Sequence, residues 1–154
     1  MNNEIYQIDD LDRKILRELY KDARASFVDI AKKLVVSNAT IHQRVQKMKL
    51  YGVLSGFQPV VDEAKLGMTV TCIIGVNLKN AKDCQAVLDK LEKISEVREA
   101  YYTTGSYALI LKVVTSDIHN FQIFLMEKLQ HIAEVQSTES FICLSKPISK
   151  SLKF

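Results

Sequence analysis

Residues 37–52 of the chain, SNATIHQRVQKMKLYG, constrain its fold more than any other stretch. Ser37 is a preferred helix N-cap, because its hydroxyl can accept a hydrogen bond from a free backbone amide of the first turn. Gly52 can take the left-handed conformation that ends a helix. The apolar residues between them recur at helical spacing: Ile41, Val45 and Met48. We therefore predict a helix with one buried side and one exposed side.

The exposed side of this predicted helix carries amide, hydroxyl and basic groups and no acidic residue. Such groups contact base edges and phosphates in the major groove of DNA. The candidate DNA-binding residues are Ser37, Asn38, Ala39, Thr40, His42, Gln43, Arg44 and Lys47. An ordinary solvent-exposed helix could have the same composition, so the preceding segment has to decide between the two interpretations.

Residues 26–34 predict another helix directly before the first. Ser26 and Asp29 have the S-x-x-D spacing of a helix start. The apolar set that follows is Phe27, Ile30, Ala31 and Leu34. Two short helices joined across residues 35–37 form a helix-turn-helix, a motif whose second helix enters the major groove of DNA.

An earlier helix completes a three-helix domain over residues 1–52. Asp9 or Asp10 is the expected cap, and Lys21 lies near its C-terminal end. Its apolar stripe consists of Leu11, Ile15, Leu16 and Leu19.

The excess positive charge of the chain also lies in this region. The net charge is +3; residues 1–52 carry ten Lys and Arg against seven Asp and Glu, whereas residues 53–154 carry eleven of each. This is a local basic patch, so we expect DNA affinity to depend on several such patches acting together.

The hydrophobic period changes after the third helix. Residues 53–59 are rich in β-branched and aromatic residues but contain Gly56 and Pro59, so we predict a short wing strand within a linker of residues 53–67. From residue 68 to residue 78 every even position is apolar, which predicts a strand with one buried face. A second domain would thus cover residues 68–154.

Helical and alternating apolar patterns predict five further elements in this domain. They are a helix around residues 84–94, strands at 97–104 and 107–115, a helix at 118–130 and a strand at 135–144. Gly105 and Ser106 suit a two-residue hairpin in which Gly105 has a positive φ. The order β-α-β-β-α-β is ferredoxin-like, so the predicted fold class is α+β, a winged helix-turn-helix followed by a ferredoxin-like domain.

Two apolar surfaces of the second domain predict self-association. The helix at residues 118–130 is apolar nearly all round, and the sheet face away from the helices is also apolar. The residues expected on that face are Ile73, Gly75, Ala108, Ile110 and Val114. Surfaces of this kind are typical of subunit contacts, so we expect a homodimer or a larger closed assembly.

No pattern in the sequence indicates an enzyme, a cofactor, a metal site or a membrane protein. His42, His119 and His131 share no ligand spacing, and no phosphate loop or nucleophile–base set is visible. No apolar run approaches the roughly 20 residues that span a bilayer, and the N-terminus lacks a signal-peptide pattern, so we expect a cytoplasmic protein. The cysteines are expected to be buried free thiols: Cys72, Cys84 and Cys143.

Five segments resemble the leucine-responsive and asparagine-responsive regulator family, Lrp/AsnC. They are LDRKIL, DIAKKLVVS, IHQRVQKMKLYGVLSGF, EAYYTTGSY and EVQSTES, of which the last two are most similar to the asparagine-responsive branch. The resemblance implies that the second domain dimerises, that dimers join into octamers, and that a small amino acid binds in clefts between dimers.

The resemblance also implies the position of the effector site. Its residues would be Tyr101, Thr103, Thr104, Gly105, Ser106, Tyr107, Gln130, Gln136, Ser137 and Thr138. Asparagine, leucine and methionine are the candidate effectors, and a side-chain amide would suit Gln136. Ala108 departs from the family pattern, since many members have Asp there, where it could hold the ligand ammonium. Hairpin threonines and strand glutamines can also serve local hydrogen bonds alone.

We predict an effector-modulated transcription regulator that binds double-stranded DNA. A dimer would place the two copies of the helix at residues 37–52 in half-sites about one turn of DNA, roughly 34 Å, apart. One alternative is an architectural protein that wraps DNA without an effector. Another is a small-molecule-binding module that has lost DNA binding.

Overall fold

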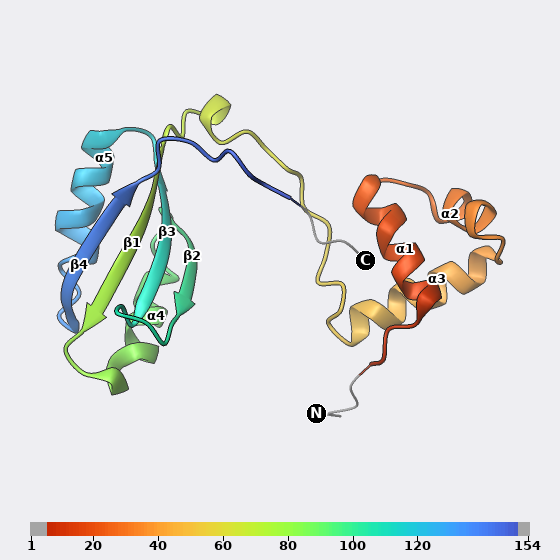
Figure 1. The fold of residues 1–154 in the computed structure, drawn as a ribbon, viewed down its shortest axis with the longest axis horizontal. Coiled ribbons are helices and arrows are strands. Elements are labelled where there is room, and N and C mark those ends of the chain that lie inside the picture. Colours follow the sequence, from red (N-terminus) through yellow and green to blue (C-terminus); the bar gives the residue numbers. More distant parts are fainter. Residues whose placement is uncertain (1–5, 151–154) are drawn as a thin grey trace. The chain divides into compact units, whose positions relative to one another are not determined.

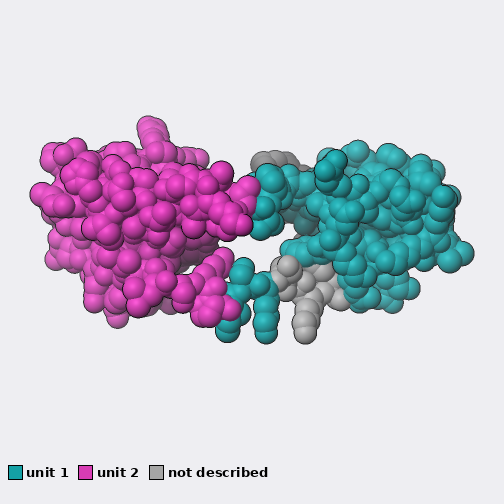
Figure 2. Space-filling model, turned by 90° about the horizontal axis from the view of Figure 1, so that it is seen from above, with its two compact units in different colours: residues 1–60, 148–154 teal, residues 61–147 magenta. Residues whose placement is uncertain are grey.

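The computed structural model describes residues 6–150, and it divides into two compact units that we describe separately (Figure 2). The first unit holds the chain up to residue 60 together with the segment from residue 148, and the second holds residues 61–147. The division falls inside the predicted linker of residues 53–67. No helix within residues 6–150 combines the length and the apolar character needed to cross a membrane.

Three helices form the described part of the first unit, labelled in Figure 1. They are α1 (Asp10–Lys21), α2 (Phe27–Leu34) and α3 (Asn38–Leu50). Asp9 caps α1 in a capping box with Asp12, because each side chain accepts from the backbone amide of the other residue. Ser26 caps α2 by accepting from the amide of Asp29, as its spacing predicted.

The apolar stripes of the three helices meet in one core. Ile41, Val45 and Met48 of α3 are at most 1% exposed, which confirms the predicted stripe. They pack with buried residues of α1 and α2, namely Ile15, Leu16, Leu19, Ile30 and Ala31. Full burial of each larger side chain contributes about 1.5–3 kcal/mol, so this core holds α3 against the other two helices.

Val35 forms the sharp turn between α2 and α3. Its φ of 56° is left-handed, and it is the one non-glycine residue with positive φ in the described part of the chain. The turn brings the amide of Val36 to the carbonyl of Ala31 at 3.0 Å, closing the C-terminus of α2. Val35 itself is 89% exposed, so no packing of its side chain offsets the strained backbone.

The wing strand predicted for residues 53–59 is not formed. The whole segment between α3 and the first strand is described, and its regular structure is the short 3-10 helix Ala64–Leu66. Val53 and Leu54 instead fold back on α3, with both amides donating to the carbonyl of Met48. β-propensity alone does not make a strand, because its backbone groups need a paired neighbour, and no strand within residues 6–150 pairs with this segment.

The second unit is a four-stranded antiparallel sheet with the order β2-β3-β1-β4. Its strands are β1 (Val70–Leu78), β2 (Val97–Tyr102), β3 (Leu109–Thr115) and β4 (Val135–Ile142). The chain order and the spatial order are those of the predicted ferredoxin-like fold. One face of the sheet packs on α4 (Cys84–Leu91) and α5 (Ile118–Ile123), as Figure 1 shows.

The alternation predicted for β1 is confirmed. Cys72, Ile74 and Val76 are fully buried on the helix side. The register pairs Ile73 with Lys112 and Gly75 with Ile110, so these four residues lie on the opposite face. Val114 also belongs to that face but is buried, whereas Ala108 precedes β3 and is not part of a strand.

The helix predicted at residues 118–130 contains a π-helical segment. α5 continues directly into Phe124–Leu129, where the amide of Gln130 donates to the carbonyl of Leu125. The wider turn places Phe124 and Leu129 on the same buried side although they are five residues apart. Its outer side leaves two apolar residues more than half exposed: Ile118 and Met126.

The three cysteines are free thiols, as predicted, but only Cys72 is fully buried. Burial, with Cys143 nearby, raises the pKa of the Cys72 thiol to about 11. Cys84 is half-buried beside the core. Cys143 is exposed just beyond β4, so the expectation that all three would be buried was wrong for this residue.

Candidate DNA-binding helix and effector loop

The exposed side of α3 presents a row of uncharged polar and basic groups. Asn38, Ala39, Gln43 and Lys47 are all exposed, and residues 38–50 contain no acidic side chain. Gln43 and Lys47 are one helical turn apart, so their side chains leave the helix on the same side. This arrangement can contact base edges through the amide and phosphates through the ammonium group.

The hydroxyl groups at the start of α3 serve its N-terminus. Ser37 Oγ accepts from the amide of Thr40 at 3.0 Å and lies 2.8 Å from Thr40 Oγ1. Ser37 is exposed and Thr40 half-buried. The cap also leaves free backbone amides at the positive end of the helix, where a phosphate would be stabilised.

His42 is an exposed residue that also contacts α2. Its ring lies 4.6 Å from the ring of Phe27 with an interplanar angle of 81°, an edge-to-face contact. The contact joins the first turn of α2 to α3.

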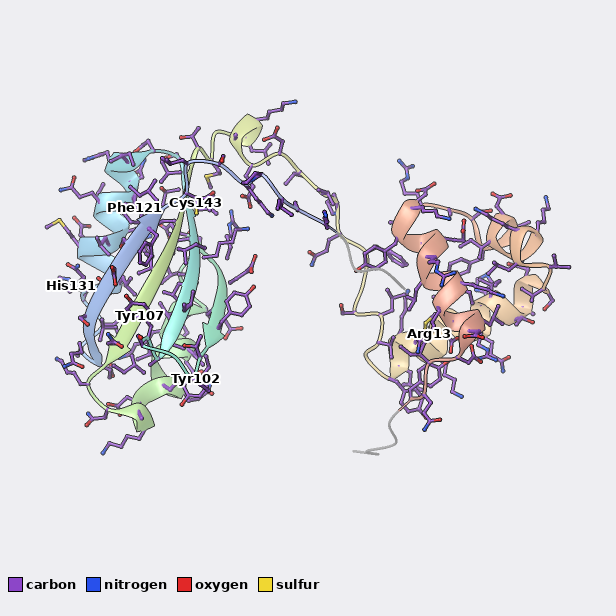
Figure 3. All side chains as sticks on the ribbon, in the orientation of Figure 1. Arg13, Tyr102, Tyr107, Phe121, His131 and Cys143 are labelled. Carbon is purple, nitrogen blue, oxygen red and sulfur yellow. The ribbon has the colours of Figure 1, made fainter. Side chains whose placement is uncertain are left out.

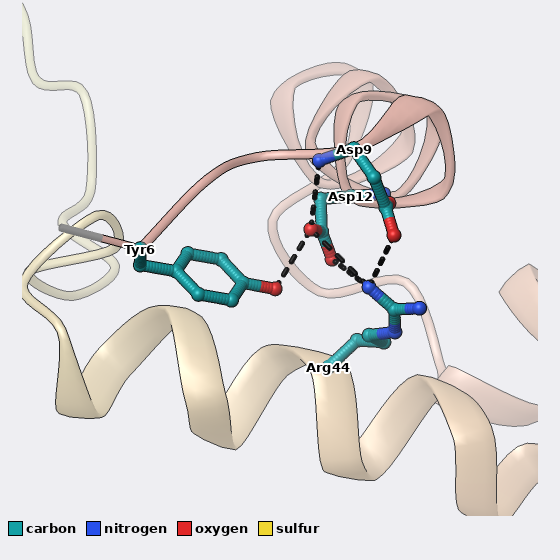
Figure 4. Close-up of polar contacts among 4 residues, drawn as sticks. All are labelled: Tyr6, Asp9, Asp12 and Arg44. Atoms are coloured by element: carbon teal, nitrogen blue, oxygen red, sulfur yellow. Dashed lines mark hydrogen bonds and ion pairs between the residues drawn. The ribbon is translucent and has the colours of Figure 1, made fainter. Parts of the chain in front are cut away.

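Arg44 is placed differently from the sequence prediction. Its guanidinium Nη1 lies 2.5 Å from Asp9 Oδ2 and 3.4 Å from Asp12 Oδ2, both at the start of α1 (Figure 4). Its side chain is 33% exposed. Arg44 therefore joins α3 to α1, and two protein carboxylates face its positive charge.

Tyr6 adds a second contact between the start of the described chain and α3. Its hydroxyl donates to Asp12 Oδ2 at 2.7 Å, and its ring stacks on Tyr51 at 5.4 Å. Lys47 Nζ lies 5.0 Å from the centre of the same ring, a cation–π contact. Burial, together with the hydrogen bond to Asp12, raises the pKa of the Tyr6 phenol. Sequence reasoning missed Tyr6 because it precedes any helical pattern.

In the second unit, the loop of residues 103–108 replaces the predicted two-residue hairpin. β2 ends at Tyr102 and β3 begins at Leu109, and the loop is closed by a 3.0 Å hydrogen bond from the Thr103 amide to the Ala108 carbonyl. Thr103 Oγ1 donates to the carbonyl of Tyr107 across the loop. Gly105 does not have a positive φ, and a Cβ at this position would meet no atom within 4 Å. The predicted reason for a glycine here was therefore wrong.

Tyr107 carries this loop onto the sheet face opposite the helices (Figure 3). A Cβ on Gly75 would lie only 2.5 Å from Tyr107 Cγ, so the ring rests on the glycine backbone. The Tyr107 hydroxyl donates to a carboxylate oxygen of Glu139, which is the β4 partner of Gly75. The structure thus brings a carboxylate next to the predicted effector loop.

Glu139 was missed by sequence reasoning, although a signal for it was present. It alternates with Ser137 and Phe141 along β4, so these three residues share the face on which Tyr107 lies. Ala108 offers no carboxylate, whereas Glu139 accepts a hydrogen bond directly from a side chain of the loop.

The remaining predicted effector residues are only partly brought together. Ser137 Oγ accepts from Asn77 Nδ2 at 3.3 Å on the Tyr107 face, and Tyr101 lies on that face as the β3 partner of Ile110. Thr138 pairs with Val76 and therefore lies on the helix side of the sheet. The others are exposed: Thr104, Gly105, Ser106, Gln130 and Gln136.

Tyr101 is occupied by a local contact within its own strand. Its hydroxyl donates to Glu99, and this hydrogen bond raises the pKa of the Tyr101 phenol and lowers that of the Glu99 carboxyl. Lys112 lies 3.4 Å from the same carboxylate. The Tyr101 ring remains 54% exposed, so it can still contribute an apolar surface.

A cavity of about 690 Å³ lies at another part of this unit. Its lining includes Met68, Ile73, Lys112 and Leu144, but none of the ten predicted effector residues. None of the predicted effector residues therefore lines the cavity, although Glu99, which accepts from the Tyr101 hydroxyl, is part of its lining.

Comparison with known proteins identifies both parts of the chain. The AsnC-type helix-turn-helix domain family matches residues 8–49, and the Lrp/AsnC ligand binding domain family matches residues 71–152. Regulatory protein AsnC of Haemophilus influenzae is 48% identical over 149 residues, which cover 97% of this chain and 99% of that protein.

Two solved structures have the same fold. The structure of Escherichia coli AsnC is 47% identical with a TM-score of 0.91, and the alignment covers 96% of this chain and 99% of that one. A transcriptional regulator from Neisseria meningitidis, solved as an L-Met complex, has a TM-score of 0.86 at 21% identity, with 96% of each chain covered. At that identity the second structure supports the fold alone.

Proposed function

The chain belongs to the Lrp/AsnC family of DNA-binding transcription regulators, and from this premise we propose which of its surfaces bind DNA and an amino-acid effector. The DNA-binding surface is the exposed side of α3. The observation that carries this assignment is a polar helix side, free of acidic residues, held in place by the buried stripe Ile41, Val45 and Met48.

Lys47 and Gln43 have different tasks in this proposal. Lys47 binds a backbone phosphate, so it contributes affinity that falls with salt, whereas Gln43 contacts a base edge and contributes sequence discrimination. Asn38, Ala39 and His42 lie at the N-terminal half of the helix, the part that approaches base edges in helix-turn-helix proteins. Ser37 and Thr40 contribute through the capped helix N-terminus.

The test compares Lys47→Ala with Gln43→Ala on operator and random DNA at several salt concentrations. Lys47→Ala should reduce the slope of log K against log salt by about 0.9 on both DNAs. Gln43→Ala should leave the slope unchanged and reduce the preference for operator by about 1–3 kcal/mol. Lys82→Ala removes the same charge in the second unit and serves as the control. Equal binding of operator and random DNA by the wild type would favour an architectural DNA-wrapping protein instead.

The effector is a small amino acid held by the loop of residues 103–108 and neighbouring parts of β4. A zwitterion needs amides or hydroxyls for its carboxylate and an acidic group for its ammonium. Thr103, Thr104 and Ser106 supply the former, and Glu139 supplies the latter in place of the missing acid at Ala108. The family match over residues 71–152 supports a ligand-binding role, and asparagine, leucine and methionine are the candidates.

Calorimetry with these three amino acids tests the assignment. Glu139→Gln should weaken binding of the preferred amino acid at least tenfold, because the ammonium loses its counter-charge. Glu127→Gln, which removes an exposed acid from the π-helical segment, should leave binding unchanged. If the wild type, Glu139→Gln and Glu127→Gln bind the amino acid equally well, Glu139 is not part of the effector site.

We also assign the open sheet face to self-association, with dimers joining into octamers in the cytoplasm. Ile73 and Ile110 are partly buried there, and Phe141 is 50% exposed in a single chain. Exposed apolar surfaces of this kind are typical of subunit contacts. Sedimentation velocity should show assemblies that Phe141→Glu dissociates; a monomeric wild type would contradict the assignment.

A further inference from the structure

Arg44 occupies a place in the first unit that DNA contact by itself does not explain. It lies at the middle of α3, between Gln43 and the buried Val45, and its guanidinium turns toward α1 (Figure 4). The two carboxylates that receive it are Asp9, which caps α1, and Asp12, which completes the capping box. The contact therefore joins the centre of one helix to the first turn of another.

Asp12 is the buried member of this cluster. It is 0% exposed, and it accepts from the Tyr6 hydroxyl at 2.7 Å and from the Asp9 amide at 3.2 Å in addition to its contact with Arg44. A buried carboxylate is costly unless its charge is paired and its oxygen atoms are hydrogen-bonded. The position of Arg44 is thus fixed by a group that cannot move into solvent without breaking the start of α1.

The electrostatics of the cluster agree with this geometry. The hydrogen bond to Asp9 raises the pKa of the Arg44 guanidinium, while the Asp12 amide, with Arg44 beside it, lowers the pKa of the Asp9 carboxyl. Two carboxylates face one guanidinium, so the cluster has no positive charge to offer a phosphate. Tyr6 completes it and also lies below Lys47.

We propose that Arg44 is a positioning residue for DNA binding: with Asp9, Asp12 and Tyr6 it sets how α3 is held against α1, and hence how Gln43 and Lys47 are presented, without contacting phosphate itself. The inference rests on the proposed role of α3. It differs from a direct contact in a measurable way, because positioning affects affinity through geometry whereas a phosphate contact affects it through charge.

The sharpest test changes an acid rather than the arginine. Asp12→Asn keeps the size and the hydrogen-bond acceptor of the capping box but raises the net charge by one, which by simple electrostatics favours DNA. We expect it to weaken operator binding about tenfold, comparable with the loss of a base contact. Asp10→Asn makes the same charge change at an exposed neighbouring position and should bind operator at least as well as the wild type.

A second test uses the salt dependence of binding between 50 and 200 mM salt. Arg44→Ala should weaken operator binding about tenfold or more while the slope of log K against log salt stays within about 0.3 of the wild type. Lys47→Ala should lower that slope by about 0.9. All titrations are done at a temperature where circular dichroism shows the variants to be folded, and the neutral variant Arg44→Gln replaces Arg44→Ala if the latter unfolds.

The outcomes separate the alternatives. A slope reduced by about 0.9 in Arg44→Ala would make Arg44 a phosphate contact. Unchanged affinity in folded Arg44→Ala and Asp12→Asn would reduce the cluster to a stabilising role and overturn the proposal. If the wild type does not bind DNA at all, the proposed function of α3 fails before the role of Arg44 is reached.

Discussion

The ring of Tyr107 lies directly on Gly75, at a distance that no other residue type at position 75 would permit. A Cβ there would be 2.5 Å from Tyr107 Cγ and 2.6 Å from Cδ1, well inside carbon–carbon contact distance. The glycine thus allows the loop of residues 103–108 to cross β1 and reach Glu139 on β4. Through this contact the loop is held on the sheet face opposite the helices.

Gly75→Ala should displace the Tyr107 ring and destabilise the second unit by about 1–3 kcal/mol, the usual cost of overpacking. Chemical denaturation followed by tyrosine fluorescence and circular dichroism measures this. Tyr107→Ala removes the obstacle, so adding Gly75→Ala to it should cost far less than Gly75→Ala alone. Additive effects in this double-mutant cycle would show that the two residues do not interact.

Val35→Gly should stabilise the first unit by about 1 kcal/mol. The left-handed conformation costs a non-glycine residue roughly 1–2 kcal/mol, and the larger conformational entropy of glycine in the unfolded chain offsets part of the gain. Val36→Gly is the matched control, because Val36 packs partly against the core and its removal should destabilise. Thermal unfolding of both variants gives the comparison, and a lower melting temperature for Val35→Gly would contradict the strain argument.

Gly105→Ala should leave the stability of the single chain within about 0.5 kcal/mol of the wild type, because its φ is not left-handed and a Cβ would meet open space. This makes the variant informative about ligand binding. If calorimetry shows weaker effector binding while the unfolding transition is unchanged, the position is close to the ligand. A large loss of stability would instead indicate a conformation different from the one described.

Acid should destabilise the first unit through two carboxylates. The Asp12 amide lowers the pKa of Asp9 from its ordinary value of 3.8, and hydrogen bonds from Lys33 and Lys21 lower that of Glu18 from 4.5. Groups with a lowered folded-state pKa contribute stability above their ordinary pKa, and this contribution is lost as the pH falls through the folded-state value. Stability should thus be level above about pH 5 and fall below about pH 4.

Urea unfolding between pH 3 and pH 7 measures this dependence. Glu18→Gln should make stability fall less steeply below about pH 4, whereas Asp10→Asn, which removes an exposed carboxylate from the same helix, should leave the pH dependence as in the wild type. If the stability of Glu18→Gln falls with acid as steeply as that of the wild type, Glu18 does not contribute to the pH dependence.

Much of the fold was predictable because it depends on local signals. Cap residues such as Ser26 and Ser37 mark helix starts by a chemistry that needs no distant partner, and the alternation around Cys72, Ile74 and Val76 specifies a buried strand face. The prediction of the wing strand was wrong because it depended on a signal that is not local. Its residues have β-propensity, but a strand depends on a partner that the sequence does not specify.

The candidate sites were less predictable because they depend on where the ends of long side chains lie. Periodicity placed Arg44 at the edge of the polar side of α3, but it could not show that its guanidinium extends to Asp9 and Asp12 on another helix. Likewise the contact between Tyr107 and Glu139 depends on the register of β1 with β4, which alternation alone leaves open. Sequence patterns give the direction of a Cβ atom but not the end of the side chain.

The ion pairing of Arg44 has a consequence for how DNA occupancy would depend on the concentration of this regulator. Because the Arg44 guanidinium is ion-paired with carboxylates, the basic side chains left exposed on α3 are Lys47 and Lys49. A single subunit would therefore bind a DNA duplex weakly. Tight occupancy would then require several subunits to engage the same molecule at once, and it would rise steeply with protein concentration. Promoters with several binding sites spaced to match the subunits would be occupied, whereas isolated half-sites elsewhere in the chromosome would remain unbound.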